Sequence, residues 1–368
     1  MSDPGRDADQ AVYGCAVAEV PEPESVLLPG HDVPLGRYTT VRRLLPQRPR
    51  RMVGAWCFVD HFGPDDVAGR PGMQIAPHPH TGLQTVTWLV EGEIMHRDSL
   101  GSAQPITPGQ LNLMTAGHGI AHSEQSPPDH PPVMHGLQLW IALPEDARHG
   151  EARFEHHPAL PTLRDGDATV TVVAGELGGV RSPALVHTPL VGAEVLLPAG
   201  GRCRIPLDPA FENAVLVMSG AATVTGTAPE PRASSQPGTA PELRGSLEPR
   251  VSSEPGTVPE PPVSAEPGTA LAPGSLLYLG RGRSEISVEA AGETRLFLIG
   301  GEPFEEPLVM WWNFVGRTHE EILRARDEWM RGDRRFGTVD GCDDDPLPAP
   351  VMPTVRLKAR DRHGRTLG

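Results

Sequence analysis

Cysteine, aromatic residues and long apolar runs are all scarce in this 368-residue sequence. The four cysteines lie far apart and form no Cys-x-x-Cys pair, and aromatic residues make up only 5% of the chain. No apolar run approaches the length of a membrane-spanning helix. The first residues, MSDPGRDADQ, lack the apolar stretch of a signal peptide. We therefore expect a cytoplasmic protein with reduced thiols and no membrane association.

Positive charge is also in short supply. The sequence has 32 lysines and arginines against 47 aspartates and glutamates, which gives a formal net charge of -15. Its one basic cluster, residues 42–51, is short and interrupted by proline. Because a phosphate backbone is bound by a basic face, the sequence disfavours direct nucleic-acid binding.

Short apolar runs separated by glycine and proline turns fill most of the chain. In QTVTWLVEG, Val86 and Trp88 alternate with Thr85 and Thr87, which is the period of a β-strand. Such runs recur about every ten residues, a pattern typical of antiparallel sandwiches and barrels. Later runs repeat the layout: AVLVMSGAATV matches QTVTWLVEGEI, and LAPGSLLYLG matches ITPGQLNLMTAG. We interpret the chain as all-β, with two tandem copies of one small barrel.

A proline-rich insertion divides the second copy. Residues 227–270 contain ten prolines and no aromatic residue, so they cannot bury enough apolar area to order themselves. One helix is expected at the end of the second copy, with Thr318 as N-cap, Glu321 three residues later and Gly332 after its last turn. The expected organisation is a disordered tail at 1–20, a first barrel at 21–160, a second barrel at 161–226 and 271–335, the disordered insertion at 227–270, and a C-terminal tail at 336–368.

Histidine is unevenly distributed between the two copies. Eleven of the fifteen histidines lie from His61 to His157, whereas the second copy has only His187 apart from His319 in its expected helix. His78 and His80 stand at i and i+2 before a strand, and His122 and Glu124 repeat this spacing about forty residues later. Residues at i and i+2 of an extended segment point to the same side, so each pair can converge on one ion.

The four residues predict a metal site in the first barrel. Three imidazoles and one carboxylate suit iron, manganese, nickel, copper or zinc. A single His-x-His pair is more often plain loop sequence than a ligand pair, and it is the second pair that favours a site. His96, His118 and His135 are rival ligands on spacing alone.

Several motifs resemble the pirin family of bicupins. HPHTGLQTVTWLVEGEIMHRDSLG and PGQLNLMTAGHGIAHSE carry the resemblance, with VDHFGP, HGLQLWIALP and GGEPFEEPLVMWWNFVGRTHEEI as further matches. The resemblance covers roughly residues 35–340 apart from the insertion. It implies two jelly-roll-like cupin barrels, Fe(II) held by His78, His80, His122 and Glu124, no metal ligands in the second cupin, and a monomer. Cobalt is a further possible metal.

The sequence departs from the commonest pirin pattern directly after the His-x-His motif. Thr81-Gly82-Leu83-Gln84 stands where that pattern has Arg-Gly-Phe-Glu. The loss of an arginine removes a positive charge beside the expected metal. A substrate or partner that used this charge in other pirins is therefore in doubt here.

The resemblance implies two functions of different kinds. The first is a metal-dependent dioxygenase acting on quercetin-type flavonols or a related small substrate, with Glu124 as catalytic base. The alternative is a non-enzymatic, redox-sensing metalloprotein that regulates a protein partner, such as a transcriptional co-regulator or a binder of a metabolic enzyme. A cupin scaffold with a vestigial site is the third possibility.

Overall fold

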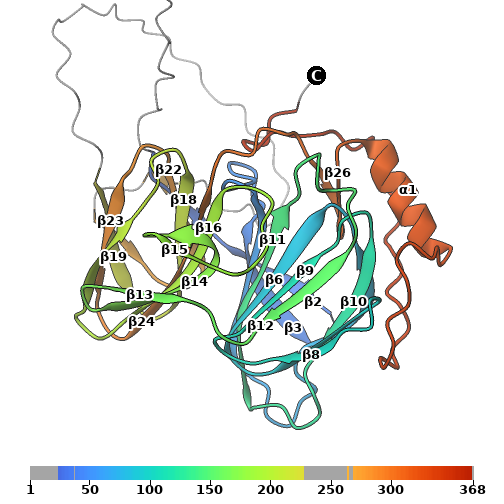
Figure 1. Ribbon diagram of the computed structural model, residues 1–368, viewed down its shortest axis with the longest axis horizontal. Helices are drawn as coiled ribbons and strands as arrows, with labels where there is room; N and C mark the ends of the chain where they lie inside the picture. The colour runs from blue at the N-terminus through green and yellow to red at the C-terminus, as the bar shows by residue number, and fades with distance from the viewer. Residues whose placement is uncertain (1–23, 37, 228–262, 265–267, 367–368) are drawn as a thin grey trace, which may run out of the picture.

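Antiparallel strands form two barrels that lie side by side (Figure 1). The computed structural model describes residues 24–36, 38–227, 263–264 and 268–366. It confirms the predicted all-β fold of two cupin barrels with a C-terminal helix. Most of the expected insertion, residues 228–262 and 265–267, and the expected N-terminal tail lie outside the described residues.

The first barrel pairs a seven-stranded sheet with a four-stranded sheet. The larger sheet has the order β12-β9-β6-β11-β4-β3-β2, and the smaller has the order β5-β10-β7-β8. The larger comprises β2 (His31–Leu35), β3 (Thr39–Leu45), β4 (Trp56–Asp66), β6 (Leu83–Glu91), β9 (Leu111–Thr115), β11 (Val133–Ala142) and β12 (Arg153–His157). The smaller comprises β5 (Gln74–His80), β7 (Ile94–Asp98), β8 (Ala103–Ile106) and β10 (Ile120–Gln125).

The second barrel repeats this plan. Its large sheet has the order β13-β14-β16-β24-β18-β22-β1-β20, with β15 beside β14, and its small sheet has the order β17-β23-β19-β21. The large sheet comprises β1 (Val26–Pro29), β13 (Thr162–Asp165), β14 (Ala168–Leu177), β15 (Val180–Arg181), β16 (Leu190–Leu197), β18 (Glu212–Ser219), β20 (Val263–Ser264), β22 (Ser275–Gly280) and β24 (Thr294–Gly301). The small sheet comprises β17 (Arg202–Pro206), β19 (Ala222–Thr227), β21 (Thr269–Leu271) and β23 (Glu285–Ala290).

The two faces of β6 lie in different environments. Val86 and Trp88 belong to a core shared by both barrels, and the indole Nε1 of Trp88 donates to Oε1 of Glu194 in the second barrel at 2.9 Å. Thr87, on the other face of the strand, points into the first barrel and donates to Glu124 at 3.0 Å. The apolar face of the strand therefore joins the barrels, and its polar face lines the interior of the first barrel.

The interiors of the two barrels differ in chemistry. The second is filled by aliphatic side chains such as Val170, Val195, Ile286 and Leu298. The first combines an apolar end, built around Phe62 and Ile94, with buried histidine, threonine and glutamate side chains. Among the described residues, the groups of side chains that could hold a metal ion lie in the first barrel.

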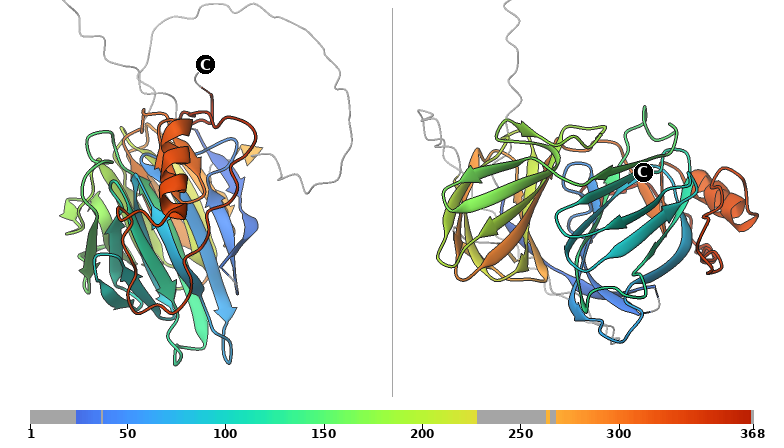
Figure 2. Two further views of the ribbon diagram at one scale, coloured as in Figure 1. Left: turned by 90° about the vertical axis from the view of Figure 1, so that its right-hand side faces the viewer. Right: turned by 60° about the horizontal axis from the view of Figure 1, so that its bottom comes forward.

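Segments near both ends of the described chain pack on the barrel that is more distant in the sequence. β1 pairs with β22, so the first described strand belongs to the second barrel. The hairpin β25 (Val309–Trp311)–β26 (Phe314–Gly316) and helix α1 (His319–Met330) return to the first barrel, where Phe314 and Ile322 pack with Ala121 of β10. Figure 2 shows α1 on the side of the first barrel that faces away from the second.

Strand pairing and side-chain packing correct three of the expected boundaries. Residues 26–29, expected within the first barrel, are a strand of the second, and residues 309–330, expected within the second, cover the first. The expected insertion extends too far, because Thr269–Leu271 pairs with β19. A strand that joins a sheet from a distant part of the sequence carries the same local pattern as a neighbouring one, so periodicity could not assign it.

The predicted helix start is confirmed. Oγ1 of Thr318 accepts from the backbone N–H of Glu321 at 3.2 Å, and Gly332 follows the helix with a positive φ of 69°. The C-terminal segment then runs along the first barrel, where Phe336 is buried and the N–H of Leu347 donates to the carbonyl of Pro77.

Candidate metal centre

The pairing of β5 with β10 brings the two histidine motifs together. These strands are antiparallel, and the register places His122 directly opposite His78. His78, His80, His122 and Glu124 are between 0% and 6% exposed. The predicted pairs thus meet on the inner face of one small sheet.

The three imidazoles converge in the interior of the barrel. Ring centroids are 5.0 Å apart for His78 and His80, 4.4 Å for His78 and His122, and 4.9 Å for His80 and His122. One nitrogen of each ring lies within 4.8 Å of the other two, so the group could hold a metal ion. Such mutual distances suit ligands that surround a single ion with nitrogen–metal bonds of about 2 Å.

Hydrogen bonds leave the Nε2 atoms available. Nδ1 of His78 lies 2.9 Å from the carbonyl of Ala76, and Nδ1 of His80 lies 3.2 Å from the carbonyl of Asn313. A carbonyl only accepts, so each Nδ1 carries the proton and each Nε2 keeps its lone pair. Nε2 of His122 is buried and has no hydrogen-bond partner among the described residues. A buried nitrogen without a partner fits a site built for a cation.

Glu124 belongs to a second, overlapping group. Its carboxylate, one nitrogen of His96 and one nitrogen of His122 lie within 4.8 Å of one another. Oε1 of Glu124 accepts from the hydroxyl of Thr87 at 3.0 Å. The four predicted residues therefore form two groups that share His122, and His96 is the rival that the structure brings closest.

Burial sets the protonation of these groups. Burial lowers the pKa of His78 to about 4, and burial together with neighbouring histidines holds the pKa values of His80 and His122 well below the ordinary range. The rings are therefore neutral at pH 7, which is the form that binds a metal. Burial also raises the pKa of Glu124, against the opposing effects of His96 and Thr87.

Two of the rival histidines lie elsewhere. His118 is exposed, and its Nδ1 lies 3.0 Å from the carbonyl of Gly150. His135 is buried, but its Nε2 pairs with Nε2 of His61 at 2.9 Å. Neither belongs to the two groups that could hold a metal.

The departures after the His-x-His motif have structural partners. Gln84 is fully buried, and its amide donates to Oγ1 of Thr115 at 2.9 Å and to the carbonyl of Leu185 at 2.8 Å. The carbonyl of Thr81 accepts from the N–H of Val315. Gln84 thus ties β6 to β9 and to the loop between β15 and β16 of the second barrel.

Three residues that support the site were not predicted. Thr87 holds Glu124, Asp98 bonds to His96 at 3.0 Å, and the carbonyl of Asn313 holds His80. The His-x-Asp spacing of His96 and Asp98 was a readable signal, since both fall on one face of β7. No sequence pattern marks a backbone carbonyl more than two hundred residues from its partner.

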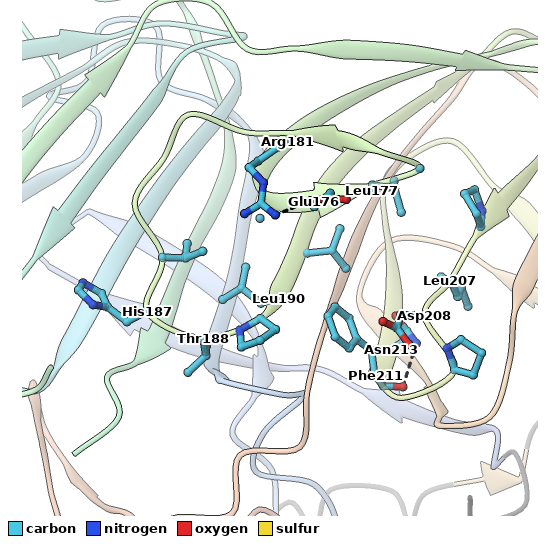
Figure 3. A pocket seen from close by; sticks show the side chains of 17 residues that line it. Glu176, Leu177, Arg181, His187, Thr188, Leu190, Leu207, Asp208, Phe211 and Asn213 are labelled. Atoms are coloured by element: carbon cyan, nitrogen blue, oxygen red, sulfur yellow. Dashed lines mark hydrogen bonds and ion pairs between the residues drawn. The ribbon is translucent and has the colours of Figure 1, made fainter. Parts of the chain in front are cut away.

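Two cavities among the described residues are lined by side chains outside these groups. One of about 860 Å³, shown in Figure 3, opens at the second barrel, where Arg181 pairs with Glu176 at 2.6 Å and His187 is the only lining imidazole. Another, of about 870 Å³, lies beside Arg97, Gln125 and Trp312. Neither is lined by any of the four predicted site residues.

Among the residues described, no helix has the length and apolar character needed to cross a membrane.

Known proteins share both the sequence and the fold. A family model described as Pirin matches residues 38–141, and one described as the Pirin C-terminal cupin domain matches residues 260–337. A Pseudomonas aeruginosa protein named "Putative quercetin 2,3-dioxygenase" is 40% identical over 319 residues, or 87% of this chain and 88% of that protein. A pirin-like protein of Caulobacter vibrioides is 32% identical over 317 residues, or 84% of this chain and 94% of that protein.

A solved structure shares the fold of this chain. A crystal structure titled quercetin 2,3-dioxygenase, from Acinetobacter baumannii, superposes with a TM-score of 0.77 at 39% identity, covering 91% of this chain and 98% of that one. Fold and site together define a bicupin with a buried histidine cluster that could hold a metal ion. The chain belongs to the pirin family, as its motifs indicated.

Proposed function

We propose that this pirin is an Fe(II)-dependent dioxygenase that cleaves quercetin-type flavonols or a related small enol. The observation that carries the proposal is the convergence of three buried imidazoles beside a buried carboxylate. Relatives whose names or titles describe quercetin 2,3-dioxygenases support the substrate class.

The ligand set follows from the free lone pairs. The metal would be bound through Nε2 of His78, His80 and His122, and Glu124, two residues after His122 on β10, would complete the set. Such a donor set suits Fe(II) first, with manganese, cobalt, nickel, copper and zinc as alternatives. A bound metal would supply Lewis-acid polarisation of the flavonol oxygens and a site for dioxygen.

The surrounding side chains suit a planar, acidic substrate. The Trp140 ring lies 5.1 Å from His80 and stacks on Phe58 at 4.0 Å, which places flat apolar rings beside the imidazoles. Thr87 occupies Oε1 of Glu124, so Oε2 is left to accept the proton of the flavonol hydroxyl. We assign Glu124 as the catalytic base on this geometry.

Metal analysis followed by an anaerobic flavonol titration tests the proposal. We expect one transition metal per chain and a shift of the flavonol absorption band on binding, because deprotonation by Glu124 extends the conjugation of the ligand. Glu124→Gln keeps the size of the side chain and an acceptor for Thr87, and should remove the shift. A wild-type protein that leaves the flavonol spectrum unchanged with every first-row divalent metal would contradict the proposal.

A second candidate function is a redox-sensing metalloprotein that regulates a protein partner. The near-complete burial of all four residues favours it, because a closed site suits electron transfer better than the entry of a large substrate. The test is a pull-down with the ferric protein and with His122→Ala. Enrichment of the same partner by both proteins would exclude metal-gated binding.

A further inference from the structure

Asp98 lies at the end of a hydrogen-bonded chain that leads to His122. It faces His122 across the pairing of β7 with β10, and Oδ2 lies 3.0 Å from Nε2 of His96. Its other oxygen, Oδ1, accepts from the N–H groups of Leu100 at 2.9 Å and Ser102 at 3.1 Å. The turn after β7 therefore fixes the carboxylate, and the carboxylate can only accept from His96.

The His96 ring is held on two sides. The Phe154 ring stacks on it at 4.3 Å between centroids with 15° between the planes. Its remaining nitrogen, Nδ1, lies 3.4 Å from Nδ1 of His122. His96 thus stands between a fixed carboxylate and an imidazole that both predicted ligand groups share.

The direction of each hydrogen bond follows from its neighbour. Because the Asp98 carboxylate accepts, His96 carries its proton on Nε2, and a neutral ring then has only a lone pair on Nδ1. Nδ1 of His122 must therefore donate to His96. That leaves the lone pair of His122 on Nε2, the buried atom that has no partner among the described residues.

We propose that Asp98 and His96 are positioning residues that select Nε2 of His122 as the metal-binding atom, and that His96 is not itself a ligand. The inference rests on the proposed metal site and extends it. It also decides between the two overlapping groups, because a His96 with both nitrogens engaged has no lone pair to offer a metal. Partners of this kind raise the basicity of the ligand and fix its tautomer.

The first test replaces Asp98 with asparagine and measures Co(II) affinity of the full chain by competition with a chelator. An asparagine can keep its turn contacts through Oδ1, but Nδ2 would donate to His96 and reverse the chain. Nε2 of His122 would then carry a proton. We expect Co(II) affinity to fall about 10–100-fold.

Asp208→Asn is the matched control. Asp208 accepts from the N–H of Ala210, two residues on, at 2.8 Å, which is the same turn contact in the second barrel without a histidine attached. Co(II) affinity of this variant should equal that of the wild type. Equal affinity in Asp98→Asn would overturn the inference.

A second pair of variants tests the role of His96 if Asp98→Asn does not fold. The amide of His96→Gln can donate to Asp98 and accept from His122, so this variant should bind Co(II) nearly as the wild type does. His96→Leu can do neither, and should lose about 10–100-fold. The inference is wrong if the two variants bind Co(II) alike.

Electron paramagnetic resonance of the Cu(II) proteins reports the ligands directly. The nitrogen hyperfine pattern should be the same in the wild type and in His96→Gln, and the loss of one coupled nitrogen in His96→Gln would make His96 a ligand. Failure of the wild type to bind any metal would reject the metal site and this inference together. Metal binding that is insensitive to Asp98 and His96 would reject the inference alone.

Discussion

The backbone carbonyl of Asn313 lies 3.2 Å from Nδ1 of His80 and accepts its proton. Asn313 sits at the tip of the β25–β26 hairpin, beside Trp312, whose φ is 52°. A bulky residue in the left-handed region costs on the order of 1–3 kcal/mol, so the surrounding packing must hold the tip in place. The β25–β26 hairpin therefore orients His80, a predicted metal ligand of the first barrel.

Phe314→Ala should weaken both the fold and the metal site. Phe314 is fully buried and packs against Phe336, so its truncation should lower the free energy of unfolding by about 3–5 kcal/mol. Loosening of the hairpin should also lower metal affinity, because His80 loses its fixed acceptor. Urea unfolding and chelator competition measure the two effects.

Leu323→Ala on the exposed side of α1 is the control for this change. It should alter the free energy of unfolding by less than about 1 kcal/mol and leave metal affinity unchanged. A Phe314→Ala protein that is destabilised but binds metal as tightly as the wild type would show that the hairpin does not orient His80.

Removal of His122 should abolish metal binding more completely than removal of any other histidine. It belongs to both groups, and its Nε2 is buried without a hydrogen-bond partner among the described residues. Metal content after purification, measured by plasma mass spectrometry, should fall to background in His122→Ala. His118→Ala should keep its metal, because His118 is exposed and bonds to Gly150. Loss of metal in both variants would contradict this assignment.

Glu212 should be essential for the contact between the barrels. It is buried, accepts from the N–H of Gly54 at 3.0 Å and from the hydroxyl of Tyr278 at 3.1 Å, and lies 3.6 Å from Arg50. Glu212→Ala should cost about 3–5 kcal/mol, because it leaves buried Arg50 with less compensation. Thermal unfolding followed by calorimetry measures the cost.

Glu289→Ala removes an exposed ion pair with Arg202 and serves as the comparison. That variant should lose far less stability than Glu212→Ala, because solvent screens the exposed pair. Similar losses in the two variants would show that the buried network around Glu212 has no special role.

Acid should destabilise the protein through the buried pair His61 and His135. Burial lowers the pKa of His61 to about 4, with His135 and Arg42 as further causes, and burial also lowers the pKa of His135, against Glu91 and beside Arg295. A histidine of lowered pKa binds its proton in the unfolded chain first, so the free energy of unfolding should fall as pH drops from about 6.5 towards 4.

The His61 contribution between about pH 7.5 and pH 5 should be on the order of 2 kcal/mol. Urea unfolding at these two values, for the wild type and for His61→Gln, isolates it. The variant should show a smaller loss of stability on acidification. An identical pH dependence would exclude His61 as a source of acid sensitivity.

Residue spacing predicted the four candidate metal ligands but not the residues that hold them in place. His78 with His80, and His122 with Glu124, share a face because of strand geometry, and strand pairing then brings both pairs together. The carbonyl of Asn313 and the strand β1 come from distant parts of the chain, where only tertiary packing decides the partner. Sequence periodicity also could not show that Val86 and Trp88 face the second barrel rather than the interior of their own.

The most direct test of the proposed activity is oxygen consumption and carbon monoxide release by the Fe(II)-loaded protein with quercetin. Dioxygen cleavage of the flavonol ring should release one carbon monoxide for each oxygen consumed, and Glu124→Gln with iron bound should lose this turnover. Absence of carbon monoxide from the fully iron-loaded wild type, and from the protein loaded with each other first-row divalent metal, would contradict the dioxygenase assignment.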